Sequence, residues 1–167
     1  MADNRLLRRG STPSARRGLL VLGSVALSLA GCQFDPHSAS YARKEPRPAA
    51  IVGVWKPTRQ SLEQLNSGGS GALQPEIEIL ADGVIRMRDI PVGWKSGAIK
   101  LGATGEGFDG RWKLERHQRW WGVTLSDSAW GCSGCLMVMQ DEPPHGLFLG
   151  YGDPDAGVGV EFERATQ

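Results

Sequence analysis

Two cysteines three positions apart are the residues of this sequence best suited to chemistry. Cys132 and Cys135 form a Cys-x-x-Cys motif, which in proteins forms a disulfide, exchanges disulfides or ligates zinc. An exchange site needs a helix N-terminus to lower the thiol pKa, whereas this pair lies between Trp130 and a β-like run. We therefore expect a structural disulfide, with thiol–disulfide exchange and a zinc site as the alternatives.

Metal ligands are sparse elsewhere in the sequence. Structural zinc requires four ligands, but no second cysteine pair is present and the histidines His37, His117 and His145 are scattered. The loop 153–157 has two aspartates that could approach calcium, yet it lacks the distal bidentate glutamate of an EF-hand. We expect neither a metal nor a cofactor.

Motifs for cofactor binding and nucleophilic catalysis occur only in part. Residues 105–110 spell Gly-x-Gly-x-x-Gly, but a dinucleotide site requires a helix after the last glycine, and a strand-like alternation follows here. The residues around Ser70 and Ser133 lack the last glycine of the Gly-x-Ser-x-Gly nucleophile motif. We nominate no catalytic residue and expect the protein not to be an enzyme.

Composition indicates one globular domain with short appendages. The chain has 167 residues, of which 40% are hydrophobic and 22% charged. Five arginines and one acidic residue precede Cys32, which leaves 14 basic and 17 acidic residues after it, a net charge of −3. Because binding to phosphates requires clustered lysine and arginine, nucleic acid is not an expected partner.

The N-terminal part has the order of an export signal. Arginines dominate residues 1–17, residues 18–30 are apolar, and small residues precede Cys32. The apolar stretch is shorter than the roughly 20 residues that span a membrane. We expect residues 1–31 to be a signal peptide that is removed on export.

Leu29-Ala30-Gly31-Cys32 resembles the cleavage box of bacterial lipoproteins. The resemblance implies that Cys32 becomes the first residue of the mature lipoprotein and carries acyl chains such as palmitate, which hold it on a membrane. The implied location is the bacterial cell envelope, on the outer face of the cytoplasmic membrane or on the outer membrane. Residues 14–20 further resemble a twin-arginine export motif, so both the general and the twin-arginine export routes stay open.

The mature chain divides into a tether and a β domain. Residues 32–50 contain prolines among small and polar residues, which predicts a flexible tether after the lipidated cysteine. From residue 51 to 167, short alternating runs separated by turn residues predict an antiparallel all-β domain of about eight strands, a small barrel or sandwich. Residues 58–66 are the one helical segment that we expect.

Particular strand faces follow from the alternation. Ile77 and Ile79 precede an Asp-Gly turn, and Ile85 and Met87 follow it, which predicts a hairpin. Trp121 shares parity with two apolar residues, so we expect it to point inward and its neighbour Trp120 outward. Further along the chain we expect another stripe of alternating residues on one face: Cys135, Met137 and Met139.

Gly53-Val54-Trp55 near the start of the domain and Arg164 at its end resemble the lipocalin pattern. The resemblance implies an antiparallel barrel whose base is closed by the Gly-x-Trp motif beneath the late basic residue. Residues 51–164 as a whole resemble uncharacterised bacterial lipoproteins, which implies an architecture and no known activity.

Two functions fit these features. The first is a lipid-anchored, non-enzymatic barrel that binds a small apolar or amphipathic ligand. The residues we expect to line its site are aromatic or methionine side chains: Trp55, Met87, Trp112, Trp121, Met137 and Phe162. The second is a protein-interaction or inhibitor module of the envelope, with tryptophans 94, 120 and 130 as its contact residues.

Overall fold

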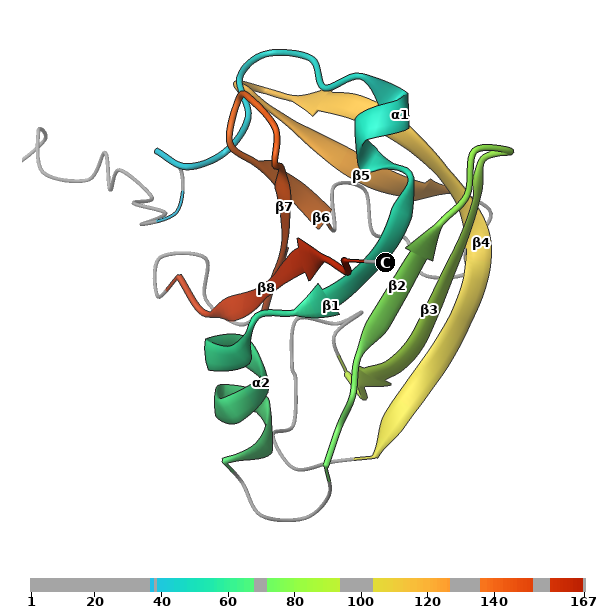
Figure 1. Ribbon diagram of the computed structural model, residues 1–167, viewed down its shortest axis with the longest axis vertical. Helices are drawn as coiled ribbons and strands as arrows, with labels where there is room; N and C mark the ends of the chain where they lie inside the picture. The colour runs from blue at the N-terminus through green and yellow to red at the C-terminus, as the bar shows by residue number, and fades with distance from the viewer. Residues whose placement is uncertain are drawn as a thin grey trace, which may run out of the picture. The chain divides into compact units, whose positions relative to one another are not determined.

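The computed structural model describes residue 37 and residues 39–67, 72–93, 104–126, 136–151 and 157–166. Over these residues the chain forms eight antiparallel strands that close into a barrel, each paired with the next and β8 with β1 (Figure 1). The strands are β1 (Gly53–Pro57), β2 (Glu76–Ile79), β3 (Val84–Pro91), β4 (Gly105–His117), β5 (Trp120–Ser126), β6 (Leu136–Met139), β7 (Gly146–Gly150) and β8 (Gly159–Arg164). The all-β prediction is confirmed, and the barrel replaces the sandwich alternative.

The β2–β3 hairpin forms as predicted. Ile77 lies opposite Met87 and Ile79 opposite Ile85, and all four side chains are fully buried. Gly83 has a φ of 84°, a left-handed conformation that glycine adopts without a steric cost. Alternation and turn chemistry together therefore determine both the register and the inward face of this hairpin.

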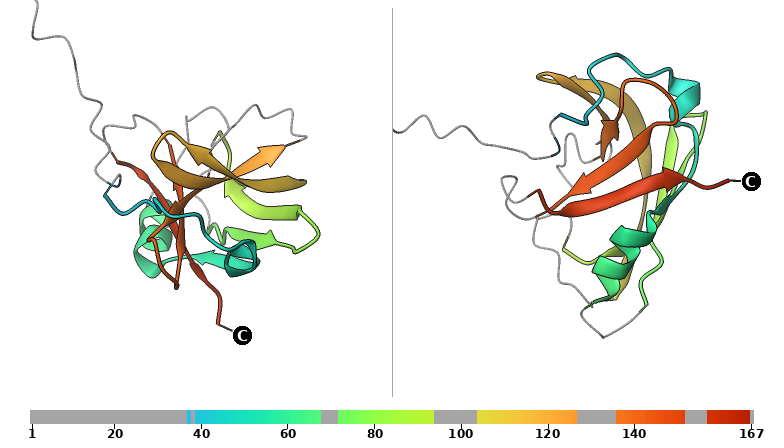
Figure 2. Two further views of the ribbon diagram at one scale, coloured as in Figure 1. Left: turned by 90° about the horizontal axis from the view of Figure 1, so that it is seen from above. Right: turned by 60° about the vertical axis from the view of Figure 1, so that its left-hand side comes forward.

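Two short helices flank β1. The expected helix is α2 (Arg59–Asn66), which begins at Thr58, whose side chain accepts the Ser61 N–H at 3.3 Å. Leu65 is buried, and α2 packs beside β8 and β1 (Figure 2). The other helix, α1 (Pro48–Ile51), was not expected; its Ile51 is fully buried and its carbonyl accepts the Trp55 indole N–H at 2.9 Å.

Large side chains of the described residues pack together inside the barrel. The largest of them are less than 2% exposed: Trp55, Phe162, Ile51, Leu65, Ile77, Ile79, Ile85, Met87, Ile90, Leu136, Leu147 and Leu149. A side chain with almost no accessible surface has no water-sized space beside it, neither solvent nor an internal void. The interior around these residues is therefore a packed core.

The N-terminal segment packs against the outside of the barrel. We call His37 and residues 39–47 the strap; in Figure 1 it leads past β6 and β7 into α1. Tyr41 bridges to Met139, and Tyr41 and Ala42 are 4% and 0% exposed. The predicted tether over 32–50 differs from this finding, because the folded part of the chain includes strap residues well before residue 51.

Unpaired backbone groups explain why the strap binds here. Among the described residues, β5 and β6 pair at Gly122–Met137 and Val123–Leu136. Beyond these pairs Ala42 lies between the two strands: its N–H donates to the Val138 carbonyl at 2.8 Å, and its carbonyl accepts the Trp121 N–H at 2.8 Å. Because buried backbone groups require partners, the strap completes the hydrogen bonding between the diverging strands.

Asp141, in the connection between β6 and β7, holds the middle of the strap. Its carboxylate accepts the backbone N–H groups of Lys44, at 2.9 Å, and Arg43. These two hydrogen bonds hold the pKa of Asp141 below its usual range. The strap is thus attached at its middle by a charged group as well as by strand-like pairing.

Met137 and Met139, which were expected to form one stripe, share the outer face of β6. Leu136 and Val138 are fully buried, whereas Met137 and Met139 are half-buried on the other face. Every residue of β6 is apolar, so periodicity could not select a face. Met137 lies opposite Phe148, whose side chain on the outer face is covered by the strap, and this cover explains why apolar residues occur on both faces.

Candidate functional site

Three of the six expected ligand-binding residues lie in the packed core. Trp55 is paired with Ile77, which is in turn paired with Met87, so the three side chains form a row across β1, β2 and β3. Phe162 joins the same core from β8. Trp55, Met87 and Phe162 are at most 1% exposed, so a ligand would reach them only by displacing core side chains.

The other three candidates are half-buried. Trp112 packs against the core and donates its indole N–H to the Leu80 carbonyl at 2.8 Å. Trp121 also packs against the core, as expected, while the ring of Trp120 lies 5.4 Å from that of Tyr41 in the strap. Met137 faces outward. The six candidates therefore do not converge on one site.

Several predicted residues lie outside the described part of the chain. These are the lipidation site, the predicted disulfide pair and two of the expected contact tryptophans: Cys32, Cys132, Cys135, Trp94 and Trp130. Their roles stay predictions.

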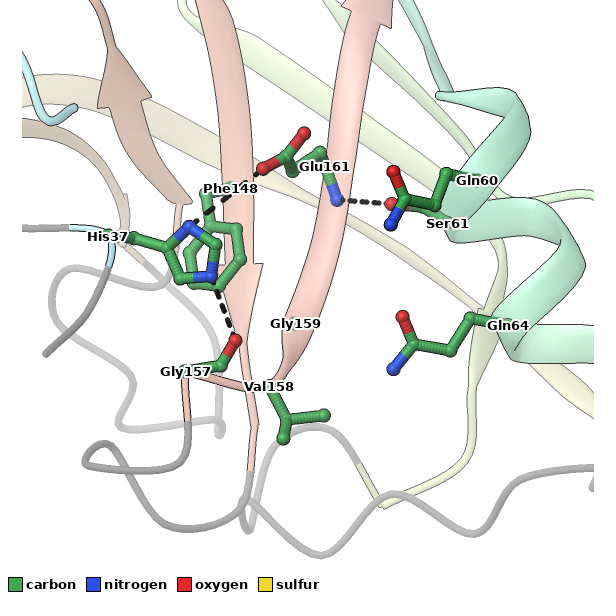
Figure 3. Close-up of a pocket in the computed structure, with 9 residues that line it drawn as sticks. All are labelled: His37, Gln60, Ser61, Gln64, Phe148, Gly157, Val158, Gly159 and Glu161. Atoms are coloured by element: carbon green, nitrogen blue, oxygen red, sulfur yellow. Dashed lines mark hydrogen bonds and ion pairs between the residues drawn. The ribbon is translucent and has the colours of Figure 1, made fainter.

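A pocket of about 220 Å³ lies between α2 and the β7–β8 edge (Figure 3). Side chains from α2, the strap and both strands face it, and the chain at the start of β8 forms part of its wall. Its lining consists of His37, Gln60, Ser61, Gln64, Phe148, Gly157, Val158, Gly159 and Glu161. None of these residues was among the six candidates, so sequence reasoning missed this site.

The strap closes one side of the pocket. His37 is hydrogen-bonded through Nε2 to the Gly157 carbonyl at 2.8 Å, and its Nδ1 lies 3.9 Å from a carboxylate oxygen of Glu161. The His37 ring lies 4.5 Å from the ring of Phe148. A residue assigned by sequence to the tether is therefore part of the pocket wall.

Phe148 lies beneath His37 on the outer face of β7 and is 4% exposed. Its ring covers Gly159, where a Cβ atom would lie 2.2 Å from the Phe148 Cζ atom. Aromatic side chains commonly cover glycines on a neighbouring strand. An aromatic residue on β7 facing a glycine-rich start of β8 is the sequence signal that could have located this side of the pocket.

The opposite wall is formed by α2. Gln60 and Gln64 are one helical turn apart and exposed, and Figure 3 shows their amides directed toward β8. Neither side-chain amide has a hydrogen-bond partner among the residues that the structure describes. Between them Ser61 is buried, and its hydroxyl accepts the Glu161 N–H at 2.9 Å, which ties α2 to β8.

This arrangement suits binding better than catalysis. The pocket contains amide, carboxylate and imidazole groups beside an aromatic ring, but the Ser61 hydroxyl already accepts a backbone hydrogen bond. Lysine and arginine do not occur among the described residues that line it, which gives these residues no positive charge to attract an anion. The groups present can orient a neutral or cationic polar molecule by hydrogen bonds.

Tyr151, which follows β7, carries a second unused polar group. Its hydroxyl is buried without a hydrogen-bond partner in the described part of the chain, and burial raises the pKa of this phenol. Such a group costs free energy unless something else pairs with it.

Three further pockets, of about 350, 380 and 570 Å³, all include Arg164 in their lining. The Arg164 side chain lies across Gly53 and donates to the Val52 carbonyl. It is paired in register with Trp55, which is the spatial relation that the lipocalin resemblance implies. Here Arg164 is engaged in closing the barrel end, so these pockets are less suited to a ligand.

The described residues contain no group of three or more histidine, cysteine or acidic side chains placed to hold a metal ion. They also contain no helix of the length and apolar character required to cross a membrane.

Comparisons with known proteins identify no relative of this chain. The chain matches no protein-family model, no curated protein and no solved structure. The barrel itself is consistent with a lipocalin-like architecture, and its function has to be argued from the site.

Proposed function

We propose that this protein is a lipid-anchored, non-enzymatic β-barrel of the bacterial cell envelope that binds a small amphipathic ligand. The ligand site is the pocket between α2 and the β7–β8 edge. The observation that carries the proposal is the pair of uncommitted amides, Gln60 and Gln64, facing Glu161 and the His37–Phe148 ring pair across about 220 Å³. Amide donors and acceptors beside an apolar ring suit a ligand with both polar and apolar parts.

The burial of the barrel core supports a ligand site on the flank. Trp55, Met87 and Phe162 are at most 1% exposed, so the interior around them offers no room for an apolar molecule. A site on the flank needs no opening of the barrel. Small barrels filled by their own side chains serve as rigid scaffolds for such sites.

The anchor and the location rest on the sequence. Leu29 to Cys32 supports lipidation of the cysteine after export. Two acyl chains or more would hold the barrel stably on a membrane, at about 0.8 kcal/mol for each buried CH₂ group. Attachment to a membrane also explains why an amphipathic ligand is the class to expect, because such molecules concentrate at the bilayer surface.

Native mass spectrometry of the full-length protein, expressed in a bacterium and extracted in detergent, tests the ligand site. We expect a co-purifying mass that disappears on denaturation. Gln64→Trp fills the pocket and should abolish that mass. Gln74→Trp makes the same change at an exposed position outside the pocket lining and should retain it.

Two results would contradict the site. One is a wild-type protein without any bound mass, which favours the protein-interaction module instead. The other is loss of the ligand from both tryptophan variants to the same extent, which would locate the ligand elsewhere.

A further inference from the structure

The strap determines where the chain enters the barrel. The barrel has two ends: strands β1, β3, β5 and β7 finish at the one that we call the α2 end, and α1 lies at the other, the α1 end. His37 contacts Gly157 and Phe148 where β8 begins, and therefore lies at the α2 end. From there the strap follows β6 and β7 toward α1.

The covalent chain limits how far Cys32 can lie from this point. Four residues separate Cys32 from His37, and an extended chain advances at most about 3.5 Å per residue. The Cα atom of Cys32 is therefore within about 18 Å of that of His37. Strand β8 alone extends from Gly159 to Arg164, about 17 Å at roughly 3.4 Å per residue, so an anchor at the opposite end would need an almost fully extended link between Cys32 and His37.

We propose that the α2 end of the barrel lies against the bilayer that carries the anchor, so that the pocket beside His37 opens onto the lipid head-group layer. This inference rests on the lipidated Cys32 of the proposed function. A flexible tether of 18 residues would allow any orientation, whereas a strap that is bound to the barrel at His37 and from residue 39 onward leaves four residues between Cys32 and its first contact with the barrel.

The chemistry of the pocket agrees with this placement. Gln60 and Gln64 offer uncharged donors and acceptors, and Glu161 is the acidic group among the described residues of the lining. Uncharged amides suit the hydrated head-group layer, which is several ångströms deep on each side of the hydrocarbon. The ligand would then be an amphipathic lipid taken from the bilayer surface and not a solute from the aqueous phase.

Fluorescence quenching in reconstituted vesicles tests the orientation. The lipidated full-length protein is incorporated into vesicles of phosphatidylethanolamine and phosphatidylglycerol that contain a lipid with a nitroxide on its head group. A fluorophore is attached at Glu63→Cys, on the exposed face of α2, or at Ala81→Cys, in the exposed β2–β3 turn at the α1 end. We expect quenching to be several-fold stronger at position 63 than at position 81.

A double variant tests whether the strap causes the orientation. His37→Ala/Tyr41→Ala removes the two ring contacts of the strap with Phe148 and should bring the quenching at the two positions close together. Equal quenching in the otherwise unchanged protein, or stronger quenching at position 81, would overturn the inference. So would a difference that the double variant leaves unaltered.

Flotation of the vesicles separates this inference from the anchor. The unlabelled protein should float with the vesicles, and Cys32→Ala should not. Failure of the protein itself to float removes the lipid anchor and the inference together, whereas flotation with equal quenching overturns the orientation alone.

Discussion

Replacement of Met87 by alanine tests whether the barrel interior is packed or hollow. Met87 is fully buried between paired residues of β2 and β4. The substitution removes three heavy atoms beyond Cβ, worth about 2.4 kcal/mol at roughly 0.8 kcal/mol per methylene equivalent. The cavity left behind adds to this cost, so we expect a loss of about 3 kcal/mol in the free energy of unfolding.

Urea unfolding followed by tryptophan fluorescence measures this loss as a shift in midpoint at constant slope. The melting temperature should fall by roughly 6–12 °C, from about 2–4 °C per kcal/mol for a chain of this size. Met137→Ala is the matched control, because it makes the same change on the half-buried outer face. It should cost about 1 kcal/mol or less.

A loss below about 1 kcal/mol for Met87→Ala would refute the packed interior. It would show that the core has space to relax around position 87, and the ligand site would then move back into the barrel. Similar losses for the two methionine variants would likewise show that the inner and outer faces of the wall are not distinguished by packing.

Three further predictions concern the strap and the unused polar group. Gly159→Ala should displace the Phe148 ring, because the added Cβ would lie 2.2 Å from that ring. We expect the free energy of unfolding to fall by about 1–3 kcal/mol. An unchanged urea midpoint would contradict the contact. The pKa of Asp141 is lowered in the folded protein, so its hydrogen bonds to the strap are present above about pH 4 and are lost as the pH falls through the folded pKa. Asp141→Asn should raise the rate of amide hydrogen exchange in the strap at pH 7. Protection of the strap amides equal to that of the wild type would refute this role. Tyr151→Phe removes a buried hydroxyl without a partner in the described part of the chain and should leave the protein as stable or up to about 1 kcal/mol more stable. A clear fall in the melting temperature would mean that the hydroxyl is hydrogen-bonded.

The fold followed from local signals wherever alternation was strict. Isoleucines separated by glutamates in β2 and methionine between arginines in β3 allow one inward face only, and the turn residues between them permit a tight connection. The residues before α2 likewise include a side chain that can cap a helix, at Thr58. These elements were predictable because each signal is contained in fewer than about ten consecutive residues.

The strap and the face of β6 could not be predicted in this way. A segment of small and polar residues between prolines indicates a flexible chain, and Tyr41 and Ala42 become buried only because β5 and β6 diverge beside them. For the same reason the sequence could not show which face of β6 Met137 occupies. Its apolar surroundings come from Phe148 and the strap, which are distant in sequence.

The candidate site depended almost wholly on tertiary structure. His37, Gln64, Phe148 and Glu161 come from four elements, and their convergence follows from barrel closure and strap docking. Sequence alone identified residue types rich in apolar surface, which the fold then used for its core.

The sequence by itself determined the strand content, the hairpin registers and the short helix, because alternation, turn residues and helix caps act between near neighbours. It also contains the signal from which a lipid anchor is expected. Only the tertiary structure decided that Trp55, Met87 and Phe162 lie in a packed core, that part of the expected tether is bound to the barrel, and that uncommitted amides face an aromatic ring across a pocket. Those outcomes depend on which backbone groups and faces remain unsatisfied after the barrel has closed, and that is a property of the whole fold.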